Sequence, residues 1–320
     1  MKRRTFLAAG AAGLAAPALL RPRLARAAAH TGGAAVLPAA MRFAVGDMTL
    51  TALLDGTLHI GPESLIGIEP DAYDDLMTAA FRDPATYPSA INAFLVQTGD
   101  QTILIDTGSG GAMGEGAGKL PANLSGAGVA PEDVTRLIVT HLHPDHIGGA
   151  VADGSAVFPN AEVHLAEAER AFWTDDANFS GADEMTRSFV DLARGTLNAY
   201  SDRLSPFDGE TEVAPGITSM PLPGHTPGHT GFMLSSGDDA VLIWTDIVHV
   251  PPVQLARPDV AIGFDVDPEQ AVETRMSILD RVVADRLMIA GSHMGFPGLA
   301  NIEADGDGYR AIDAMYGYDA

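Results

Sequence analysis

The hexapeptide HLHPDH occupies residues 141–146 and brings three histidines and one aspartate together. His141 and His143 are two residues apart, so in an extended segment both imidazoles point to the same side and can reach one ion. Pro144 stiffens the next bend and removes a backbone donor. Asp145 and His146 then present a carboxylate and a third imidazole from the other side of that bend. The pattern therefore predicts two neighbouring metal sites, one rich in imidazole and one mixed.

The composition narrows the classes of partner. With 320 residues, 46% of them hydrophobic and 19% charged, the chain is long enough to bury a sizeable core and is unlike a disordered protein. Its formal net charge of −23 repels phosphate backbones and anionic lipid, so we expect a small-molecule substrate and no nucleic acid. Because the sequence has no cysteine, any metal must be held by His, Asp or Glu.

The first 29 residues are expected to lie outside the folded domain. The pentapeptide RRTFL at residues 3–7 resembles a twin-arginine export signal, and Ala25, Ala27 and Ala29 offer cleavage sites. The apolar stretch that ends near Leu20 is too short to span a bilayer comfortably, so no stable membrane insertion is expected. The resemblance implies export of the folded protein to the periplasm or beyond. Residues 30–320 are then predicted to form a single domain, and a homodimer is an open possibility.

Strand and helix patterns alternate along the rest of the chain. Met41–Ile60 alternates apolar and polar residues, with a hairpin turn predicted at Asp55-Gly56. Two paired strands are predicted over Ala90–Val96 and Thr102–Ile105, joined at Gly99-Asp100. Further strands are expected at 136–140, 161–165, 217–220, 231–234, 240–244 and 286–290, and helices at 167–173, 183–199 and 268–283. Strands in each half with helices between them predict two sheets packed face to face and covered by helices.

Three further candidate ligands lie beyond predicted strands. His225 stands in PGHTPGH at residues 223–229, Asp246 follows the apolar run at 240–244, and His293 follows the apolar run at 286–290. Loops gather at strand ends to build functional sites. These side chains are therefore expected to join those of the HLHPDH segment.

The ordered set His-x-His-x-Asp-His, Gly-His, Asp and His resembles the metal-binding signature of metallo-β-lactamase-fold hydrolases, from about Met41 to Arg310. The resemblance implies an α/β fold in which two mixed β-sheets flanked by helices form an αββα sandwich. It also implies two divalent metal ions, most simply Zn²⁺, with Mn²⁺, Fe²⁺ or Co²⁺ as alternatives. The first ion would be held by His141, His143 and His225, the second by Asp145, His146 and His293, and Asp246 would bridge the two.

Two neighbouring residues have supporting roles in this family pattern. The ligand in a Gly-His-Thr-x-Gly-His run is the first histidine, so the resemblance implies that His229 makes a structural hydrogen bond. Asp106, in an Asp-Thr-Gly sequence at a predicted strand end, resembles a position that orients a ligand imidazole. A turn-forming aspartate is an equally good interpretation of its spacing.

The resemblance also indicates a reaction. Two ions sharing a hydroxide would attack a carbonyl carbon or a phosphorus centre, and Asp145 is placed to manage the transferred proton. Lactamases of this fold typically lack the bridging aspartate. The presence of Asp246 is instead similar to glyoxalase II, N-acyl homoserine lactonases and phosphotriesterases of the methyl parathion hydrolase type.

Three segments resemble the methyl parathion hydrolase group in particular: WTDIVH at 244–249, IGFDVD at 262–267 and GSHMGFPG at 291–298. This resemblance implies cleavage of a carboxylic ester, lactone or phosphotriester. Lactonases commonly have a tyrosine where this chain has His249. An apolar substrate needs an apolar wall, and Met113, Trp173 and His249 are predicted to line it. The alternatives are a glyoxalase II-like thioesterase and a non-catalytic metal-binding protein of the same fold.

Overall fold

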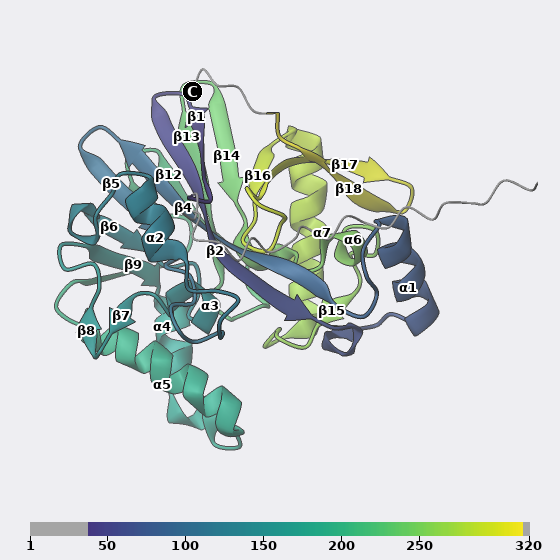
Figure 1. Ribbon diagram of the computed structural model, residues 1–320, viewed down its shortest axis with the longest axis horizontal. Helices are drawn as coiled ribbons and strands as arrows, with labels where there is room; N and C mark the ends of the chain where they lie inside the picture. The colour runs from purple at the N-terminus through teal and green to yellow at the C-terminus, as the bar shows by residue number, and fades with distance from the viewer. Residues whose placement is uncertain (1–37, 316–320) are drawn as a thin grey trace, which may run out of the picture. The chain divides into compact units, whose positions relative to one another are not determined.

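Two seven-stranded β-sheets form the centre of the computed structural model, which describes residues 38–315 (Figure 1). In spatial order, the first contains β1 (Ala40–Val45), β2 (Met48–Ile60), β4 (Tyr87–Thr98), β5 (Gln101–Ile105), β6 (Arg136–Ile138), β9 (Glu162–Ala166) and β10 (Leu204–Phe207). The second contains β11 (Glu212–Ala214), β12 (Ile217–Pro221), β13 (Thr230–Ser236), β14 (Asp239–Ile243), β16 (Met288–Ala290), β17 (Leu299–Asp305) and β18 (Gly308–Asp313). Both sheets mix parallel and antiparallel pairs. The export signal expected over residues 1–29 lies outside the described residues.

Helices and two small ribbons complete the described part of the chain. The α-helices are α1 (Pro70–Ala79), α2 (Leu120–Gly126), α3 (Pro144–Ile147), α4 (Glu167–Thr174), α5 (Glu184–Ala199), α6 (Pro251–Gln254) and α7 (Pro268–Asp285). Short 3₁₀ turns lie at Pro62–Ser64, Pro131–Asp133, Asp176–Phe179 and Thr245–Ile247. The two-stranded ribbons pair β3 (Leu65–Ile66) with β15 (Ala261–Ile262), and β7 (Val151–Ala152) with β8 (Ser155–Ala156). Within residues 38–315, no helix is both long and apolar enough to cross a bilayer.

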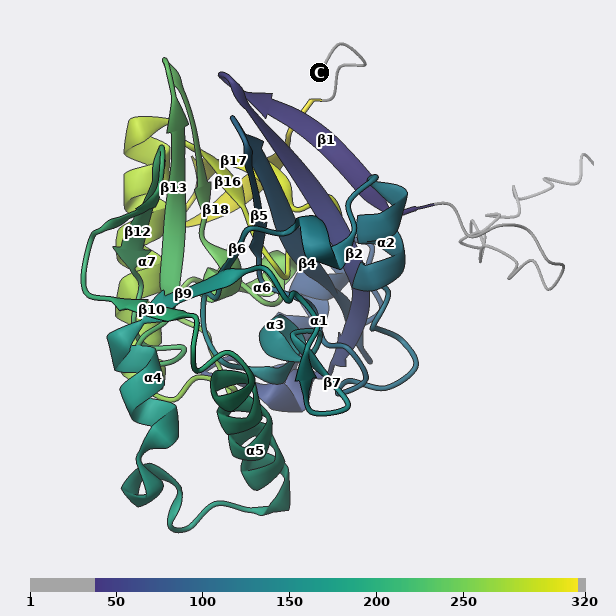
Figure 2. The same ribbon diagram turned by 90° about the vertical axis from the view of Figure 1, so that its left-hand side faces the viewer.

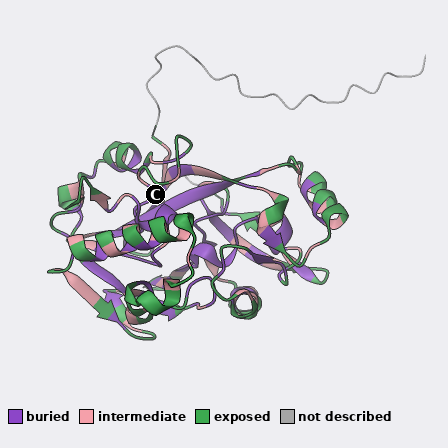
Figure 3. Ribbon diagram, turned by 90° about the horizontal axis from the view of Figure 1, so that it is seen from below, coloured by how far each residue is buried: buried purple, intermediate pink, exposed green. Residues whose placement is uncertain are grey.

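Successive side chains of a strand point to opposite faces of its sheet. In both sheets one set packs against the other sheet and the other set packs against helices on the outside. In β4, Leu95 belongs to the cluster that includes side chains of α2 and α5, whereas Phe94 and Val96 pack against the second sheet. In β14, Leu242 packs with Leu279 of α7, whereas the flanking Ile243 faces the first sheet. Figure 2 shows α2 and α7 on opposite sides of the two sheets, and Figure 3 shows the strands buried and the outer helix faces exposed. The predicted αββα sandwich is confirmed.

The ends of the two long outer helices follow from their sequences. Asp183 precedes α5 and accepts a hydrogen bond from the backbone N–H of Thr186 at 2.8 Å. Asp267 precedes α7 and accepts one from Gln270 at 3.1 Å, with Pro268 at the first helical position. Each aspartate satisfies a helix-end donor that has no partner within the helix.

The hairpin turn predicted at Asp55-Gly56 is wrong. The chain turns earlier, at Gly46-Asp47, and β2 continues through Asp55 and Gly56. Gly56 lies at a β-bulge with φ +154°, where an added Cβ would meet the carbonyl oxygen of Gly116 at 2.3 Å. A bulge and a turn both favour glycine, so the local sequence did not distinguish them.

The other strand predictions agree with the structure. The turn predicted at Gly99-Asp100 joins β4 to β5, and the strands predicted in the second half correspond to β12, β13, β14 and β16. Helices α1 and α2 and the hairpin of β17 and β18 were not predicted from the sequence.

Candidate metal centre and pocket

The loops that carry the candidate ligands leave the same edge of each sheet. In the first sheet β5 and β6 are parallel, so Asp106 and the HLHPDH segment follow strand ends that lie together. In the second sheet β14 and β16 are parallel and precede Asp246 and His293. β12, which precedes His225, runs in the same direction as β14 because both are antiparallel to β13. All seven candidate ligands are thereby brought to one region.

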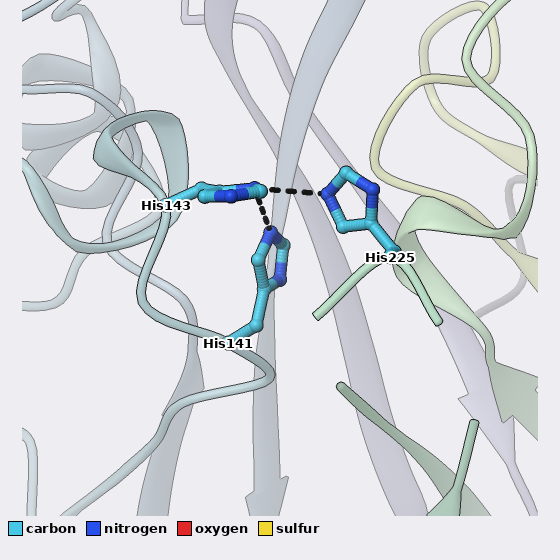
Figure 4. A group of neighbouring side chains, drawn as sticks. All are labelled: His141, His143 and His225. Carbon is cyan, nitrogen blue, oxygen red and sulfur yellow. Dashed lines mark hydrogen bonds between the residues drawn. The ribbon is translucent and has the colours of Figure 1, made fainter. Parts of the chain in front are cut away.

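Three imidazoles converge in what we term the first ligand group: His141, His143 and His225 (Figure 4). Nδ1 of His143 lies 3.1 Å from Nε2 of His141 and 2.9 Å from Nε2 of His225. The Thr140 hydroxyl lies 2.8 Å from a carboxylate oxygen of Asp106 and 3.1 Å from Nδ1 of His141.

Tautomers follow from these contacts. Thr140 gives its one proton to the carboxylate and accepts from Nδ1–H of His141, which leaves a lone pair on Nε2. His225 donates from Nδ1 to Asp265 at 2.8 Å, so once its ring is neutral the lone pair lies on Nε2. A single proton on Nδ1 of His143 can donate fully to only one of these two nitrogens, whereas a cation among the three would be bound by all of them. The geometry therefore fits a metal ion.

The second ligand group consists of Asp145, His146 and His293. Oδ2 of Asp145 lies 3.5 Å from Nε2 of His146 and 3.4 Å from Nε2 of His293. The other nitrogen of each ring is already used: Nδ1 of His146 donates to Asp106 at 2.7 Å, and Nδ1 of His293 donates to the carbonyl of Ala90 at 2.7 Å. Nε2 of His146 is buried and has no hydrogen-bond partner, so it too is available to a metal.

Asp246 lies between the two groups. Its Oδ2 is 3.1–3.7 Å from the Nε2 atoms of five histidines, namely His141, His146, His225, His249 and His293. Its Oδ1 is buried without a hydrogen-bond partner. The preceding residue, Thr245, has φ +45°, a strained conformation for a β-branched side chain. This turn aims the carboxylate at the centre of the site.

The charges of the site also fit divalent cations. Four buried carboxylates, those of Asp106, Asp145, Asp246 and Asp265, surround the imidazoles. Burial alone would lower the pKa of His225, but Asp246 and Asp265 raise it to about 9. A position that stabilises a proton on a buried imidazole also stabilises a metal ion. Together, the two ligand groups fit a binuclear site of nitrogen and oxygen donors, which suits Zn²⁺, Mn²⁺, Fe²⁺ or Co²⁺.

His229 and Asp106 contact the ligand set without joining it. His229 donates from Nδ1 to the carbonyl of Leu222 at 2.8 Å, and its Nε2 accepts from the Thr245 hydroxyl at 2.6 Å. Burial lowers the pKa of His229 to about 3, and neither nitrogen is left for a metal. Asp106 has φ +61° and uses its carboxylate to hold both His146 and Thr140.

An apolar cavity of about 370 Å³ is lined in part by five of the candidate metal ligands, namely His143, Asp145, His225, Asp246 and His293. The three predicted wall residues, Met113, Trp173 and His249, all line it, together with Phe172, Phe179, Phe189 and Phe264. Trp173 is only 3% exposed, so it is both a core and a pocket residue. Its ring stacks on Phe179 at 5.4 Å and meets His143 edge-on at 5.7 Å. No lysine or arginine is among the lining residues.

His249 lines the cavity and also contacts two of the candidate ligands. Its Nε2 is 3.3 Å from Oδ2 of Asp246, and its ring stacks on His293 at a centroid distance of 4.8 Å. The side chain of Gln254 accepts hydrogen bonds from the backbone N–H groups of His249 and Val250. Burial lowers the pKa of His249 to about 4, so the ring is neutral at neutral pH. His249, His225 and Asp246 form a further group of side chains that could hold a metal ion.

Two buried acids of this region were not predicted from the sequence. Asp265 accepts the hydrogen bond from ligand His225, and Arg275 approaches its other oxygen at 3.9 Å. Burial raises the pKa of Asp265, but the hydrogen bond and the charge of His225, with smaller contributions from His249 and the backbone of Ile262, together leave the pKa below its ordinary value. Glu169 on α4 accepts hydrogen bonds from both ligand loops. Asp265 stands in the IGFDVD segment, which gave the only signal for either residue.

Comparison with known proteins agrees with this geometry. The family described as the Metallo-beta-lactamase superfamily matches residues 86–293. An N-acyl homoserine lactonase of Bacillus cereus is 25% identical over 171 residues, covering 48% of this chain. The match spans 61% of that relative, less than two thirds of its length.

Two solved structures share the fold over most of the chain. The hydrolase AbOPH of the beta lactamase superfamily has a TM-score of 0.83 and 32% identity, covering 88% of this chain and 99% of that one. AidC, a dizinc quorum-quenching lactonase in complex with a homoserine product, has a TM-score of 0.83 and 28% identity with the same coverage. On the family match and the first of these structures, this chain belongs to the metallo-β-lactamase superfamily.

Proposed function

We propose that this protein is a binuclear metal-dependent hydrolase that cleaves a carboxylic ester, lactone or phosphotriester in a small, partly apolar and uncharged substrate. One observation carries the proposal. The Asp246 carboxylate is surrounded by imidazole nitrogens from both ligand groups, at the floor of an apolar cavity. The similarity to a dizinc lactonase and to N-acyl homoserine lactonases supports it.

The side chains around the floor have separate tasks in such a reaction. Two divalent ions, when bound, would acidify water at neutral pH and polarise the substrate oxygen. Asp246 lies between the two ligand groups and would bind both ions, which fixes the groups relative to each other. The Asp145 side chain is 11% exposed, against 1% for Asp246, and it lines the cavity. Asp145 is therefore the carboxylate placed to take and return a proton beside the substrate.

The cavity wall favours uncharged substrates. Its lining residues include phenylalanines and a tryptophan but no lysine or arginine, and the chain has a formal charge of −23. An anionic group placed against that wall would lose its hydration without gaining a cationic partner, which is costly. This argues against a glyoxalase II-like thioesterase whose substrate carries carboxylates at that end.

A panel of matched substrates tests the proposal. Esters, lactones and phosphotriesters that end in a methyl group are expected to be hydrolysed with kcat/KM about 100-fold or more above analogues that end in a carboxylate, because burying that charge costs several kcal/mol. Steady-state kinetics on each pair measures the ratio. Equal values would contradict the assignment to uncharged substrates. Metal binding without turnover of any panel member would instead favour a non-catalytic metal-binding protein.

Trp173→Ala is expected to change substrate preference and leave the metal content at its wild-type value. The substitution removes the indole that stacks on Phe179 and faces the cavity, so KM should rise for substrates with a large apolar group and change little for small ones. Burial of an aromatic side chain accounts for about 1.5–3 kcal/mol, which corresponds to a selectivity change of about tenfold or more. Unaltered kinetics across the panel would place Trp173 outside the substrate contacts.

A further inference from the structure

Glu169 is a fully buried acid that belongs to neither ligand group. It lies on α4, and its carboxylate accepts hydrogen bonds from the backbone N–H of Leu142 at 2.8 Å, the indole N–H of Trp173 at 2.7 Å, the hydroxyl of Thr226 at 2.7 Å and the backbone N–H of Gly228 at 3.1 Å. Burial raises the pKa of Glu169, and these four hydrogen bonds oppose that rise. All four partners can donate, so neither carboxylate oxygen needs to carry a proton.

The partners of Glu169 lie beside the metal ligands in sequence. Leu142 stands between His141 and His143, on the loop that follows β6 of the first sheet. Thr226 follows His225 directly, on the loop that follows β12 of the second sheet. One carboxylate therefore holds together two loops that come from different sheets and that jointly supply the first ligand group.

The loop that carries Gly228 is in close contact with α4 at this junction. An added Cβ on Gly228 would lie 2.2 Å from the backbone nitrogen of Glu169, so the second loop sits directly against the backbone of α4. A change in how Glu169 holds either loop is therefore transmitted to its neighbours, because a close-packed interior transmits strain.

The same carboxylate fixes the wall of the cavity. Oε1 of Glu169 accepts from both Leu142 and Trp173. Trp173 lies one helical turn beyond Glu169 and meets the ligand His143 edge-on. The cavity wall and the first ligand group thus share one anchor.

We propose that Glu169 is a positioning residue that sets the placement of the two loops holding the first ligand group and orients Trp173 against them. Affinity for the first metal ion and binding of the apolar part of the substrate then both depend on this one carboxylate. The inference rests on the metal site of the proposed function, and it assigns Glu169 no contact with the reacting atoms.

Glu169→Gln tests the inference with little change in volume. An amide nitrogen cannot accept a hydrogen bond, so at least one of the backbone or indole N–H groups loses its acceptor. The apparent affinity for one of the two metal ions is expected to fall about 10- to 100-fold, the range found when partners of metal ligands are removed. Competition with a chelator measures this without any substrate. KM for the substrate with the largest apolar group should rise in parallel, while KM for a small substrate changes little.

Glu167→Gln is the matched control. Glu167 lies two residues away on the same helix, is 36% exposed and pairs with Arg170. The same change of charge at this position should leave metal retention and KM within about twofold of wild type, because an exposed ion pair contributes little.

Each outcome decides the matter. Glu169→Gln with wild-type metal retention and wild-type KM overturns the inference. If that variant does not fold, Thr226→Val removes one of the four donors without a change in shape, and it should shift metal retention in the same direction by a smaller factor; no shift overturns the inference. If Glu169 only stabilised the fold, Glu169→Gln would lower the stability and leave metal retention by the folded protein unchanged. That result also overturns the inference. A wild-type protein that binds no metal would contradict the proposed function instead.

Discussion

Asp246→Asn is expected to lower kcat/KM by about a thousandfold or more and to reduce the metal content from two ions per chain towards one. The carboxylate lies within 3.7 Å of imidazoles from both ligand groups. Burial favours its neutral form, but the surrounding imidazoles, His146 first among them, hold the pKa of Asp246 well below its ordinary value. An amide brings no negative charge to the ions. The charge stabilisation lost is several kcal/mol. Because each factor of ten in rate corresponds to about 1.4 kcal/mol, a loss of this size lowers the rate by about a thousandfold.

Elemental analysis and steady-state kinetics measure the two effects together. Asp238→Asn is the control, because Asp238 is exposed in the turn that precedes β14, at the other end of the strand that leads to Asp246. It should match wild type in both measurements. An Asp246→Asn variant that keeps two ions and full activity would show that this carboxylate does not bridge the ions.

Asp55→Ala is expected to lower the free energy of unfolding by about 4 kcal/mol or more. The Asp55 carboxylate is fully buried and accepts hydrogen bonds from the backbone N–H groups of Ser109, Gly118 and Leu120 and from the Ser109 hydroxyl, at 2.6–3.0 Å. Removing the acceptor leaves four donors without a partner, three of them buried and that of Gly118 part-buried, and each buried one costs about 1–3 kcal/mol. The loop they hold carries Met113 of the cavity wall.

Urea unfolding of Asp55→Ala and of Asp100→Ala measures this cost. Asp100 lies exposed in the turn between β4 and β5, so its replacement should change the free energy of unfolding by about 0.5 kcal/mol or less. A loss below 1 kcal/mol for Asp55→Ala would mean that water or a rearranged loop replaces the carboxylate.

The sequence predicted what depends on local patterns. Short apolar runs predicted most of the strands, because those strands are packed on both faces by different layers. The ligands could be predicted because HLHPDH is contiguous and the remaining ligands each follow a strand. By contrast, Asp55-Gly56 has the composition of a hairpin turn, yet the donors that hold the Asp55 carboxylate in the structure lie more than fifty residues away in sequence.

The supporting acids were beyond local patterns for the same reason. In the sequence, Glu169 does not differ from an ordinary helical glutamate. Its partners Leu142 and Thr226 lie 27 and 57 residues away. Asp265 is 40 residues from His225. Only the packing of the two sheets brings these residues to the ligand loops. Contacts between distant segments therefore decide how the ligands are held, whereas the ligands themselves are marked by local sequence.

The number of metal ions per chain, measured with hydrolysis before and after chelation, tests the central claim most directly. The two ligand groups predict two divalent ions per chain, loss of hydrolysis of every panel substrate when both ions are removed, and recovery when Zn²⁺ or another suitable ion is restored. Hydrolysis that survives complete removal of metal would contradict a metal-dependent mechanism at this site.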